Sequence, residues 1–289
     1  MKKPALLSRM AQHIKRNMRR YGIAALSLVL CYCCAEYFGL WGASQLECNT
    51  CSITGNSLNQ AGPLKIAFFS DIHNSREKLA QVVEILKEAK PDIIFFGGDL
   101  VYADDRFKRT KWAVDSFRQL NNIAPTFVIL GNHDYEKQEQ VERVYQAAGV
   151  KLLRNQSVDW RTPVGTTIRI IGLGDYNEGD DMPDTCLSPA SDETPLVILL
   201  AHDPECRWNL RKYKWDLLLS GHTHGGQLGI PFTDKYISFR SSAPAGHYHF
   251  ENGKQIFVTR GTGAILGMRF FCPPEVNIIN IPANKSDKK

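Results

Sequence analysis

The sequence predicts an α/β fold over positions 64–283, and two observations carry that prediction. Short apolar runs alternate with segments of helical period through the first half of this region. The runs show no polar–apolar alternation, which is typical of strands buried on both faces of a sheet. We therefore expect a single domain in which helices cover buried sheets.

The first half of the domain is expected to contain strands and helices in strict alternation. Ser75 can cap the first helix, and Pro91 follows its end. The strands are expected at 64–70, 93–96 and 126–130, and the helices at 75–90, 109–120 and 136–148.

The second half is richer in strands than in helices. Asn252 and Gly253 stand between two apolar runs, and this pair predicts a hairpin. The strands are expected at 167–173, 196–201, 217–220, 246–250, 255–259 and 276–281. An acidic loop over 175–193 and a Pro-containing stretch over 231–245 interrupt them.

The charge of the chain is concentrated at its N-terminus. Thirty-five Lys and Arg face 30 Asp and Glu, which gives a net charge of +5. Positions 1–20 hold seven basic residues and no acidic ones, so the rest of the chain carries 28 − 30 = −2. Such a body lacks the basic surface of a nucleic-acid-binding domain, and we expect no nucleic-acid partner.

An apolar segment follows the basic residues. Positions 21–35 would span about 22 Å as a helix, and continuing it to Ala43 gives about 35 Å, enough for a hydrocarbon core of about 30 Å. Tyr37 and Trp41 then fall where interfacial aromatic residues belong. We expect a retained membrane anchor, with a cleaved signal peptide or a peripheral amphipathic segment as alternatives.

The chain is thus expected to have five parts. They are a basic N-terminal arm at 1–20, a transmembrane anchor or uncleaved signal at 21–43, a linker at 44–63, the folded domain at 64–283 and a polar tail at 284–289. The positive-inside rule places the N-terminus in the cytoplasm and the domain on the other side of the membrane.

Polar clusters follow five of the expected strands, at the point where each strand ends. Strand ends meet at one edge in α/β folds, so these side chains are expected to lie together. Mixed oxygen and imidazole donors suit Mn, Fe, Zn, Ni or Co, and a bridging carboxylate can hold two ions about 3.5–4 Å apart. In order, the clusters are Asp71-Ile-His73, Gly97-Gly-Asp99, Gly131-Asn-His-Asp134, Ala201-His202 and Gly221-His-Thr-His224.

The five clusters resemble the motifs of the calcineurin-like metallophosphoesterase superfamily, which are D-x-H, G-D-x-x, G-N-H-D/E, a lone H and G-H-x-H. The flanking residues are similar to the membrane-associated bacterial phosphodiesterase branch, which includes a UDP-2,3-diacylglucosamine pyrophosphatase of lipid A synthesis. The resemblance implies a four-layer αββα sandwich over 64–283. The flanking matches are Phe69-Ser-Asp-Ile-His73, Gly221-His-Thr-His-Gly-Gly-Gln227, and Thr259-Arg-Gly-Thr-Gly263 with Cys272-Pro-Pro-Glu-Val276.

The resemblance also implies a centre of two divalent metal ions, with manganese preferred and Fe, Zn, Ni or Co as alternatives. Asp99 would bridge the two ions. The other ligands would be Asp71, His73 and His224 for one ion and Asn132, His202 and His222 for the second.

Four further residues are candidates for catalysis or substrate binding. By resemblance, His133 would be the general acid, and Asp134 would orient it. Asn74 and Arg260 are candidate substrate contacts. For Arg260, an ordinary ion pair is the alternative.

The implied activity is hydrolysis of phosphodiester or pyrophosphate bonds by in-line attack of a metal-bound hydroxide. We expect a membrane-associated substrate, because an anchor holds the domain near lipid and because 231–247 offers Phe232, Tyr236 and Phe239 as an apolar loop. A nucleotide-linked lipid such as UDP-2,3-diacylglucosamine is the most specific candidate. The remaining alternatives are a general periplasmic phosphodiesterase, a phosphoprotein phosphatase and a non-catalytic membrane-tethered scaffold.

The expected location is the bacterial inner membrane, crossed once, with the catalytic domain in the periplasm. This topology conflicts with the favoured substrate, because UDP-sugars are made in the cytoplasm. A cytoplasmic domain is therefore kept as the alternative. No segment of the sequence indicates a protein partner.

Overall fold

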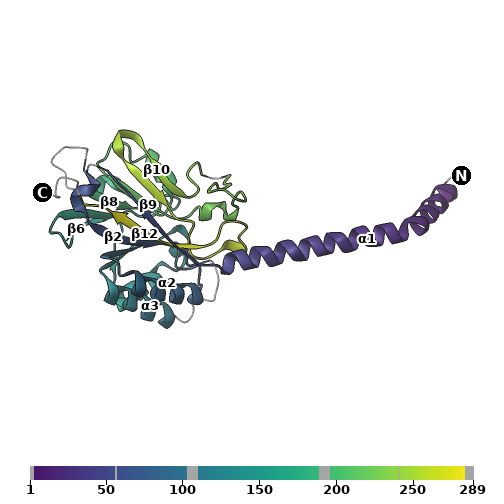
Figure 1. Ribbon diagram of the computed structural model, residues 1–289, viewed down its shortest axis with the longest axis horizontal. Helices are drawn as coiled ribbons and strands as arrows, with labels where there is room; N and C mark the ends of the chain where they lie inside the picture. The colour runs from purple at the N-terminus through teal and green to yellow at the C-terminus, as the bar shows by residue number, and fades with distance from the viewer. Residues whose placement is uncertain (1–2, 56, 103–109, 189–195, 240, 284–289) are drawn as a thin grey trace.

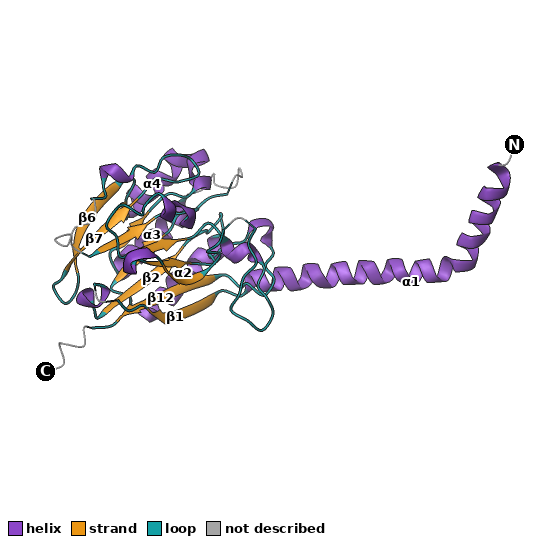
Figure 2. Cartoon of the chain, turned by 90° about the horizontal axis from the view of Figure 1, so that it is seen from above, coloured by secondary structure: helices purple, strands orange, loops and turns teal. Residues whose placement is uncertain are grey.

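The computed structural model describes residues 3–55, 57–102, 110–188, 196–239 and 241–283. Two six-stranded sheets pack face to face, and a long N-terminal helix extends away from them (Figures 1 and 2). The predicted α/β fold with buried sheets is confirmed. Arg109, the predicted start of the second helix of the domain, and the tail at 284–289 lie outside the described residues.

The first sheet carries the helices on its outer face. β2, β3, β4 and β5 run parallel, whereas β12 is antiparallel to β2 and parallel to β1. In spatial order, the strands are β1 (Glu47–Ser52), β12 (Glu275–Ile281), β2 (Leu64–Phe69), β3 (Ile93–Phe96), β4 (Thr126–Val128) and β5 (Lys151–Leu152). The helices are α2 (Arg76–Ala89), α3 (Lys111–Ile123) and α4 (Gln138–Ala148).

The second sheet is parallel in its centre and antiparallel at both edges. In spatial order, its strands are β10 (Gly246–His249), β11 (Gln255–Val258), β9 (Leu217–Ser220), β8 (Val197–Leu200), β7 (Thr167–Gly172) and β6 (Gln156–Arg161). Short 3₁₀ helices connect the elements of the fold: η1 (Leu58–Ala61), η3 (Asn132–Lys137), η4 (Pro183–Thr185), η5 (Pro204–Trp208), η6 (His224–Gln227), η7 (Glu251–Gly253) and η8 (Ile265–Gly267).

The core lies in three layers, which explains why the strands read as continuous apolar runs. Phe68 and Phe95 of the first sheet face Ile170 and Leu200 of the second, and all four side chains are fully buried. The outer face of the first sheet packs on α2, α3 and α4. Both faces of each central strand are therefore buried, as parallel sheets require.

The layer on the outer face of the second sheet differs from the helical layer that the αββα prediction places there. Among the described residues, the outer face of the second sheet is covered by loops and by η5, and not by an α-helix. Trp215 and Leu210 fill this side of the core. Pro204 begins η5, and the helical segment ends within five residues. The arrangement of helices, sheet, sheet and irregular cover therefore replaces the αββα sandwich.

The predicted linker at 44–63 is wrong over much of its length. Glu47–Ser52 forms β1 and pairs in parallel with β12, and Ile53 and Leu58 are buried. The local sequence is polar and gives no strand signal, because β1 is an edge strand whose partner is more than 200 residues away. The strands β5 and β6 were likewise not expected from their residues.

The N-terminal helix α1 (Lys3–Ser44) has 42 residues and joins the basic arm to the apolar segment without a break. Its part Arg20–Ser44 has 25 residues, a mean hydropathy of 1.8, and almost no burial against the domain. At about 1.5 Å per residue this part is longer than the hydrocarbon core of a bilayer. By length and composition, α1 is therefore able to cross a membrane.

Arg260, directly after β11, forms a buried ion pair that ties the first sheet to the second. Its Nη2 lies 2.7 Å from Glu275 Oε2 at the start of β12 and 2.9 Å from Glu47 Oε2 at the start of β1. Asn49 Nδ2 donates to the same Glu275 oxygen at 2.6 Å. A buried guanidinium that loses its carboxylate partner lowers the stability of the fold strongly. The ion pair therefore holds the end of β11 against the starts of β12 and β1.

Replacing Glu275 by Ala should therefore lower the free energy of unfolding by about 3–5 kcal/mol, because the buried Arg260 loses its buried partner and keeps only the half-exposed Glu47. The matched control is Glu251→Ala, which removes an exposed pair with Arg211 at 3.0 Å and should cost less than about 1 kcal/mol. Urea unfolding followed by tryptophan fluorescence in detergent measures both. Equal losses in the two variants would contradict the assignment.

Candidate metal centre

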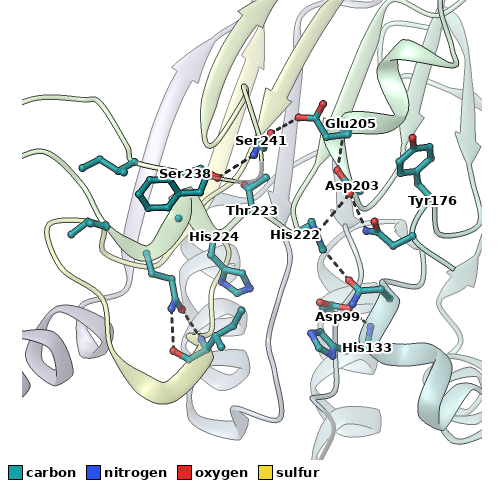
Figure 3. A pocket seen from close by; sticks show the side chains of 18 residues that line it. Asp99, His133, Tyr176, Asp203, Glu205, His222, Thr223, His224, Ser238 and Ser241 are labelled. Carbon is teal, nitrogen blue, oxygen red and sulfur yellow. Dashed lines mark hydrogen bonds and ion pairs between the residues drawn. The ribbon is translucent and has the colours of Figure 1, made fainter.

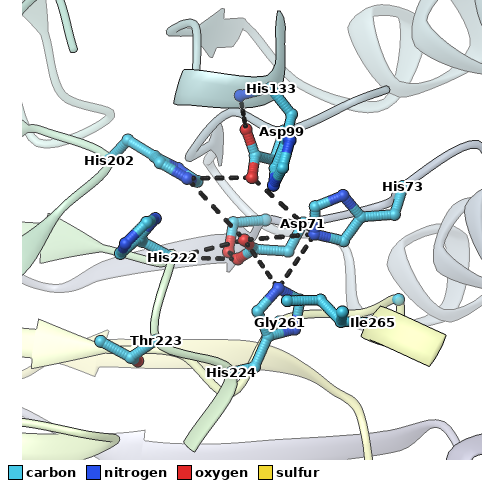
Figure 4. A network of polar contacts seen from close by, with 12 residues as sticks. Asp71, His73, Asp99, His133, His202, His222, Thr223, His224, Gly261 and Ile265 are labelled. Atoms are coloured by element: carbon cyan, nitrogen blue, oxygen red, sulfur yellow. Dashed lines mark hydrogen bonds and ion pairs between the residues drawn. The ribbon is translucent and has the colours of Figure 1, made fainter. Parts of the chain in front are cut away.

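The five polar clusters lie together where strands of both sheets end (Figure 4). Asp71 and His73 follow β2, and Asp99 follows β3. From the second sheet, His202 follows β8, and His224 belongs to the loop after β9. The polar side chains were expected at the ends of neighbouring strands, and they come from the strand ends of both sheets.

Most of these residues have left-handed backbone conformations. This conformation costs roughly 1–2 kcal/mol for a residue other than glycine, so the surrounding structure has to enforce it. Backbone hydrogen bonds between the loops after β2 and β3 do so, from Asp71 N to Gly98 O (2.9 Å) and from His73 N to Asp99 O (3.1 Å). The residues with positive φ at the site are Asp71, His73, Asn74, Asp99, His222 and His224.

Two buried carboxylates form the centre of the cluster. Asp71 Oδ1 lies 3.3 Å from His224 Nε2 and 3.8 Å from His73 Nε2. Asp99 Oδ2 lies 3.2 Å from His202 Nε2 and 3.8 Å from His73 Nε2. Within two sets, Asp71, His73 and His224, and Asp71, Asp99 and His202, all ligand atoms lie within 4.8 Å of one another.

Backbone hydrogen bonds of two histidines turn their Nε2 atoms toward these carboxylates. His202 Nδ1 lies 2.7 Å from Gly97 O, and since a carbonyl only accepts, Nδ1 carries the proton. Its Nε2 is buried, faces Asp99, and has no hydrogen-bond partner in the described part of the chain. His73 Nδ1 lies 3.2 Å from Val101 O and carries its proton there too, while its Nε2 lies 2.9 Å from His224 Nε2 and 3.8 Å from Asp71 and Asp99. A buried imidazole nitrogen held against a carboxylate carries either a proton or a cation, and the donor set matches a divalent metal.

The electrostatics of the cluster favour positive charge between the carboxylates. Burial alone would lower the pKa of His202, but Asp99 and Asp71 raise it well above its usual value. Burial lowers the pKa of His224, and the neighbouring His73 lowers it further. The pKa of His73 is also lowered, chiefly by burial. His73 and His224 are thus held neutral, the form in which imidazole binds metals.

Asn132 and His222 lie together beside this cluster. Asn132 Oδ1 is 3.0 Å from His222 Nδ1, and His222 N donates to Asp71. The rings of His222 and His202 are 5.2 Å apart. Asp203 completes this side, with Oδ2 3.7 Å from His222 Nε2. Asp203 was not expected from the sequence, and its position directly after His202 is the only signal that marks it.

His133 lies over the cluster, whereas Asp134 is buried beneath it. His133 N donates to Asp99 Oδ1 at 3.0 Å, and its ring is 4.8 Å from that of Tyr102. The Asp134 carboxylate accepts from the backbone N–H of Asp99, Gly131 and Val101 at 2.9–3.1 Å. Burial and the nearby Asp99 raise the pKa of Asp134. Its contacts are therefore with the backbone of the loops, and not with the His133 ring that it was expected to orient.

The two candidate substrate contacts differ in their surroundings. Asn74 Nδ2 donates to Tyr102 O at 3.1 Å, and its Oδ1 is buried with no partner in the residues described. The guanidinium of Arg260 is engaged by Glu275 and Glu47. For Arg260, the structure shows the ion pair that the sequence left as an alternative.

Arg269 is a further residue of the site that the sequence did not indicate. It is fully buried, its Nη2 donates to Arg260 O at 2.7 Å and to Gly263 O, and this nitrogen lies 3.0 Å from His224 Nδ1. The guanidinium thereby joins the loop 260–263 to the loop that carries His224. These contacts are tertiary, so no local pattern could reveal them.

A pocket of about 800 Å³ opens above the cluster (Figure 3). Its polar side is lined by Asp99, His133 and His222, together with Asn177 of the expected acidic loop. That part of the loop therefore belongs to the site, while 189–195 lies outside the described residues. The apolar side of the pocket is formed by Leu228, Ile237, Phe239 and Ile265.

Comparison with known proteins agrees with this geometry. Residues 64–226 match the family described as Calcineurin-like phosphoesterase. The chain is similar to Phosphodiesterase YaeI of Escherichia coli (strain K12), with 32% identity over 232 residues, which cover 77% of this chain and 84% of the relative. It is also 32% identical over 229 residues to the uncharacterized metallophosphoesterase YkuE of Bacillus subtilis (strain 168), covering 75% and 78%. The chain therefore belongs to the calcineurin-like phosphoesterase family and is a metal-dependent phosphoesterase.

Proposed function

We propose that the protein hydrolyses phosphodiester or pyrophosphate bonds with two divalent metal ions, of which manganese is the first candidate. The observation that carries the proposal is the buried Nε2 of His202, which faces Asp99 at 3.2 Å without a hydrogen-bond partner in the described residues. Asp99 Oδ2 also faces His73, so this carboxylate stands between histidines of two ligand sets. That position supports a bridging role.

The ligands of each ion are proposed from the way the side chains are grouped. The first set is held together by Asp71, which lies beside both of its histidines. The contact between Asn132 and His222 supports the second. The proposed sets are Asp71, His73 and His224 for one ion, and Asn132, His202 and His222 for the other, with Asp99 shared.

The two ions, when bound, lower the pKa of water and offset the negative charge that builds on the phosphoryl oxygens. The residues of the chain supply the remaining steps. His133 lies at the pocket wall beside Asp99 and is placed to donate a proton to the leaving oxygen. Asn74 has one amide oxygen without a partner in the described chain, which supports its role as a further polar contact.

The substrate is proposed to be associated with a membrane. Two features support this: α1 is long and apolar enough to span a bilayer, and one wall of the pocket is apolar. UDP-2,3-diacylglucosamine combines a pyrophosphate with acyl chains and is the specific candidate. A general periplasmic phosphodiesterase is the second candidate, because the basic N-terminal residues favour a domain outside the cytoplasm. Mass spectrometry of products from this lipid, with a simple phosphodiester as control, distinguishes the two.

Replacing Asp99 by Ala should remove metal and activity together, because the carboxylate shared by both ions is lost. We expect at most one bound ion, and turnover of bis-p-nitrophenyl phosphate reduced by more than about 100-fold, since outer residues of metal sites alone cost about 10–100-fold. Elemental analysis and a chromogenic assay measure these values. Asp159→Asn, on strand β6 away from the site, is the control, and a fully active Asp99→Ala protein would refute the dimetal proposal.

Replacing His133 by Ala should leave the metal content unchanged but slow turnover by about 10²–10⁴-fold for substrates with poor leaving groups. A nitrophenolate leaves without a proton, so bis-p-nitrophenyl phosphate should be affected much less than a dialkyl diester. The exposed His249 of β10 provides the control, His249→Ala. An equal loss on both substrates would exclude His133 as the general acid.

The membrane location is tested on the intact chain. The protein should stay in the membrane fraction after an alkaline carbonate wash, because transfer of an apolar helix of this length into lipid is effectively irreversible. A reporter fused after residue 283 should be active in the periplasm. Complete recovery of the protein in the soluble fraction contradicts the anchor, and a cytoplasmic reporter would favour UDP-2,3-diacylglucosamine.

A further inference from the structure

The open side of the pocket carries an apolar rim that extends beyond the apolar pocket wall and takes no part in the proposed hydrolysis. The side chains of Phe232 and Phe239 are essentially fully exposed, and that of Phe271 is 65% exposed. Large exposed apolar groups gathered in one region mark an interaction surface. The rim consists of Leu228, Ile230, Phe232, Ile237, Phe239 and Phe271.

The residues of the rim belong to two stretches that are hydrogen-bonded to each other. Gly229 N donates to Phe270 O at 2.8 Å, which joins the stretch 228–239 to the stretch 269–271. Ile237 N donates to Leu228 O at 2.8 Å and closes the first stretch into a hairpin-like loop. Phe232 lies at the tip of this loop.

The second of these stretches, 269–271, is packed against α1. Arg269 N donates to Gly39 O at 2.9 Å, and a Cβ at Gly39 would come within 2.6 Å of the Phe270 ring. At Gly42, a Cβ would lie 2.2 Å from Arg269 O. The glycines therefore permit direct backbone contact between the rim and the helix. In Figures 1 and 2, loops of this region lie on the side of the body from which α1 leaves.

This contact sets the depth of the rim in a membrane. Gly39 lies five residues before the end of α1 at Ser44, or about 7 Å along the axis. The headgroup layer on each side of a bilayer is about 5–7 Å thick. If α1 spans, the rim is held at this layer, where aromatic side chains are favoured. The neighbouring charges of Asp234 and Lys235 offset each other and remain exposed, which suits the same level.

The rim is continuous with the pocket. Leu228, Ile237 and Phe239 belong both to the rim and to the pocket wall, opposite Asp99 and His222. Any partner that binds to the rim therefore lies directly at the mouth of the pocket.

We propose that the rim is a membrane-docking surface whose partner is the bilayer crossed by α1, so that the pocket opens onto the lipid headgroups. The inference rests on the proposed function for the identity of the site, and it specifies how substrate arrives. A phosphate in the headgroup of a membrane lipid enters along the apolar wall, and its acyl chains remain in the bilayer.

The docking is tested with the full-length protein in vesicles of phosphatidylethanolamine and phosphatidylglycerol that contain doxyl-labelled lipid. An environment-sensitive fluorescent amino acid is placed at Phe232 in one protein and at Val164 in another. Val164 is also an exposed apolar residue, but it lies in the turn between β6 and β7. The label at 232 should lose at least about half of its fluorescence in contact with the membrane, and the label at 164 should lose none.

A second comparison tests the role of the rim itself. In protein labelled at Phe239, the double change Phe232→Ser and Phe271→Ser should reduce quenching by the doxyl lipid, whereas Val164→Ser should not. Hydrolysis of bis-p-nitrophenyl phosphate by the unlabelled double variant should match that of the unchanged protein.

Two kinds of result overturn the docking proposal, and a third bears only on the proposed function. An unquenched label at 232, or equal quenching at 232 and 164, overturns docking whatever the activity. Loss of activity toward bis-p-nitrophenyl phosphate in the double variant also overturns it, because the two rings would then support the site. An unchanged protein that never hydrolyses the diester overturns the proposed function, but it leaves the quenching result standing.

Discussion

The site depends on one constraint: the chain must turn sharply at the ends of its strands while its side chains still point inward. L-residues meet this demand in the left-handed region, at a cost of roughly 1–2 kcal/mol each. The loops that follow neighbouring strands lie so close together that their backbones have little room for another conformation. A Cβ at Gly131 would lie 2.2 Å from Asp99 Oδ1, and one at Gly221 would lie 2.6 Å from Asp71 Oδ2. Two large apolar interfaces stabilise the strands and thereby hold this strained arrangement in place.

The buried charged side chains of the site have two different roles. Asp71 and Asp99 face the histidines and create a region that attracts cations. Asp134, although it is equally buried, is enclosed by backbone N–H groups and stabilises the loops that present Asp99. Arg269 stabilises the opposite side through carbonyl groups. Similar ionisable side chains therefore either face the histidine cluster or support its loops, according to whether their partners are side chains or backbone.

The sequence predicted the parts of the structure that are local. Apolar runs identified the central strands, and the polar clusters that follow them identified the residues that the fold brings together. It failed where the cause is a distant partner. The polar strand β1 is stabilised by β12, and the role of Asp134 depends on donors up to 35 residues away. Arg269 carries no signal because its acceptors come from several separate loops. Arg260 follows a strand, as the residues of the site do, but its side chain is directed toward Glu275 by their hydrogen bond.

The hydrogen bond from Arg269 to Gly39 has a consequence for how the protein matures. The same residue contacts α1 through its backbone and the His224 loop through its guanidinium. A signal peptidase that cut after the apolar segment would remove the helix turn on which Phe270 packs and would expose that ring. Proteolytic release would thus disturb a loop that reaches the ligand cluster. The end of α1 is therefore part of the packing of the domain, and the integrity of the site is coupled to the presence of this helical turn.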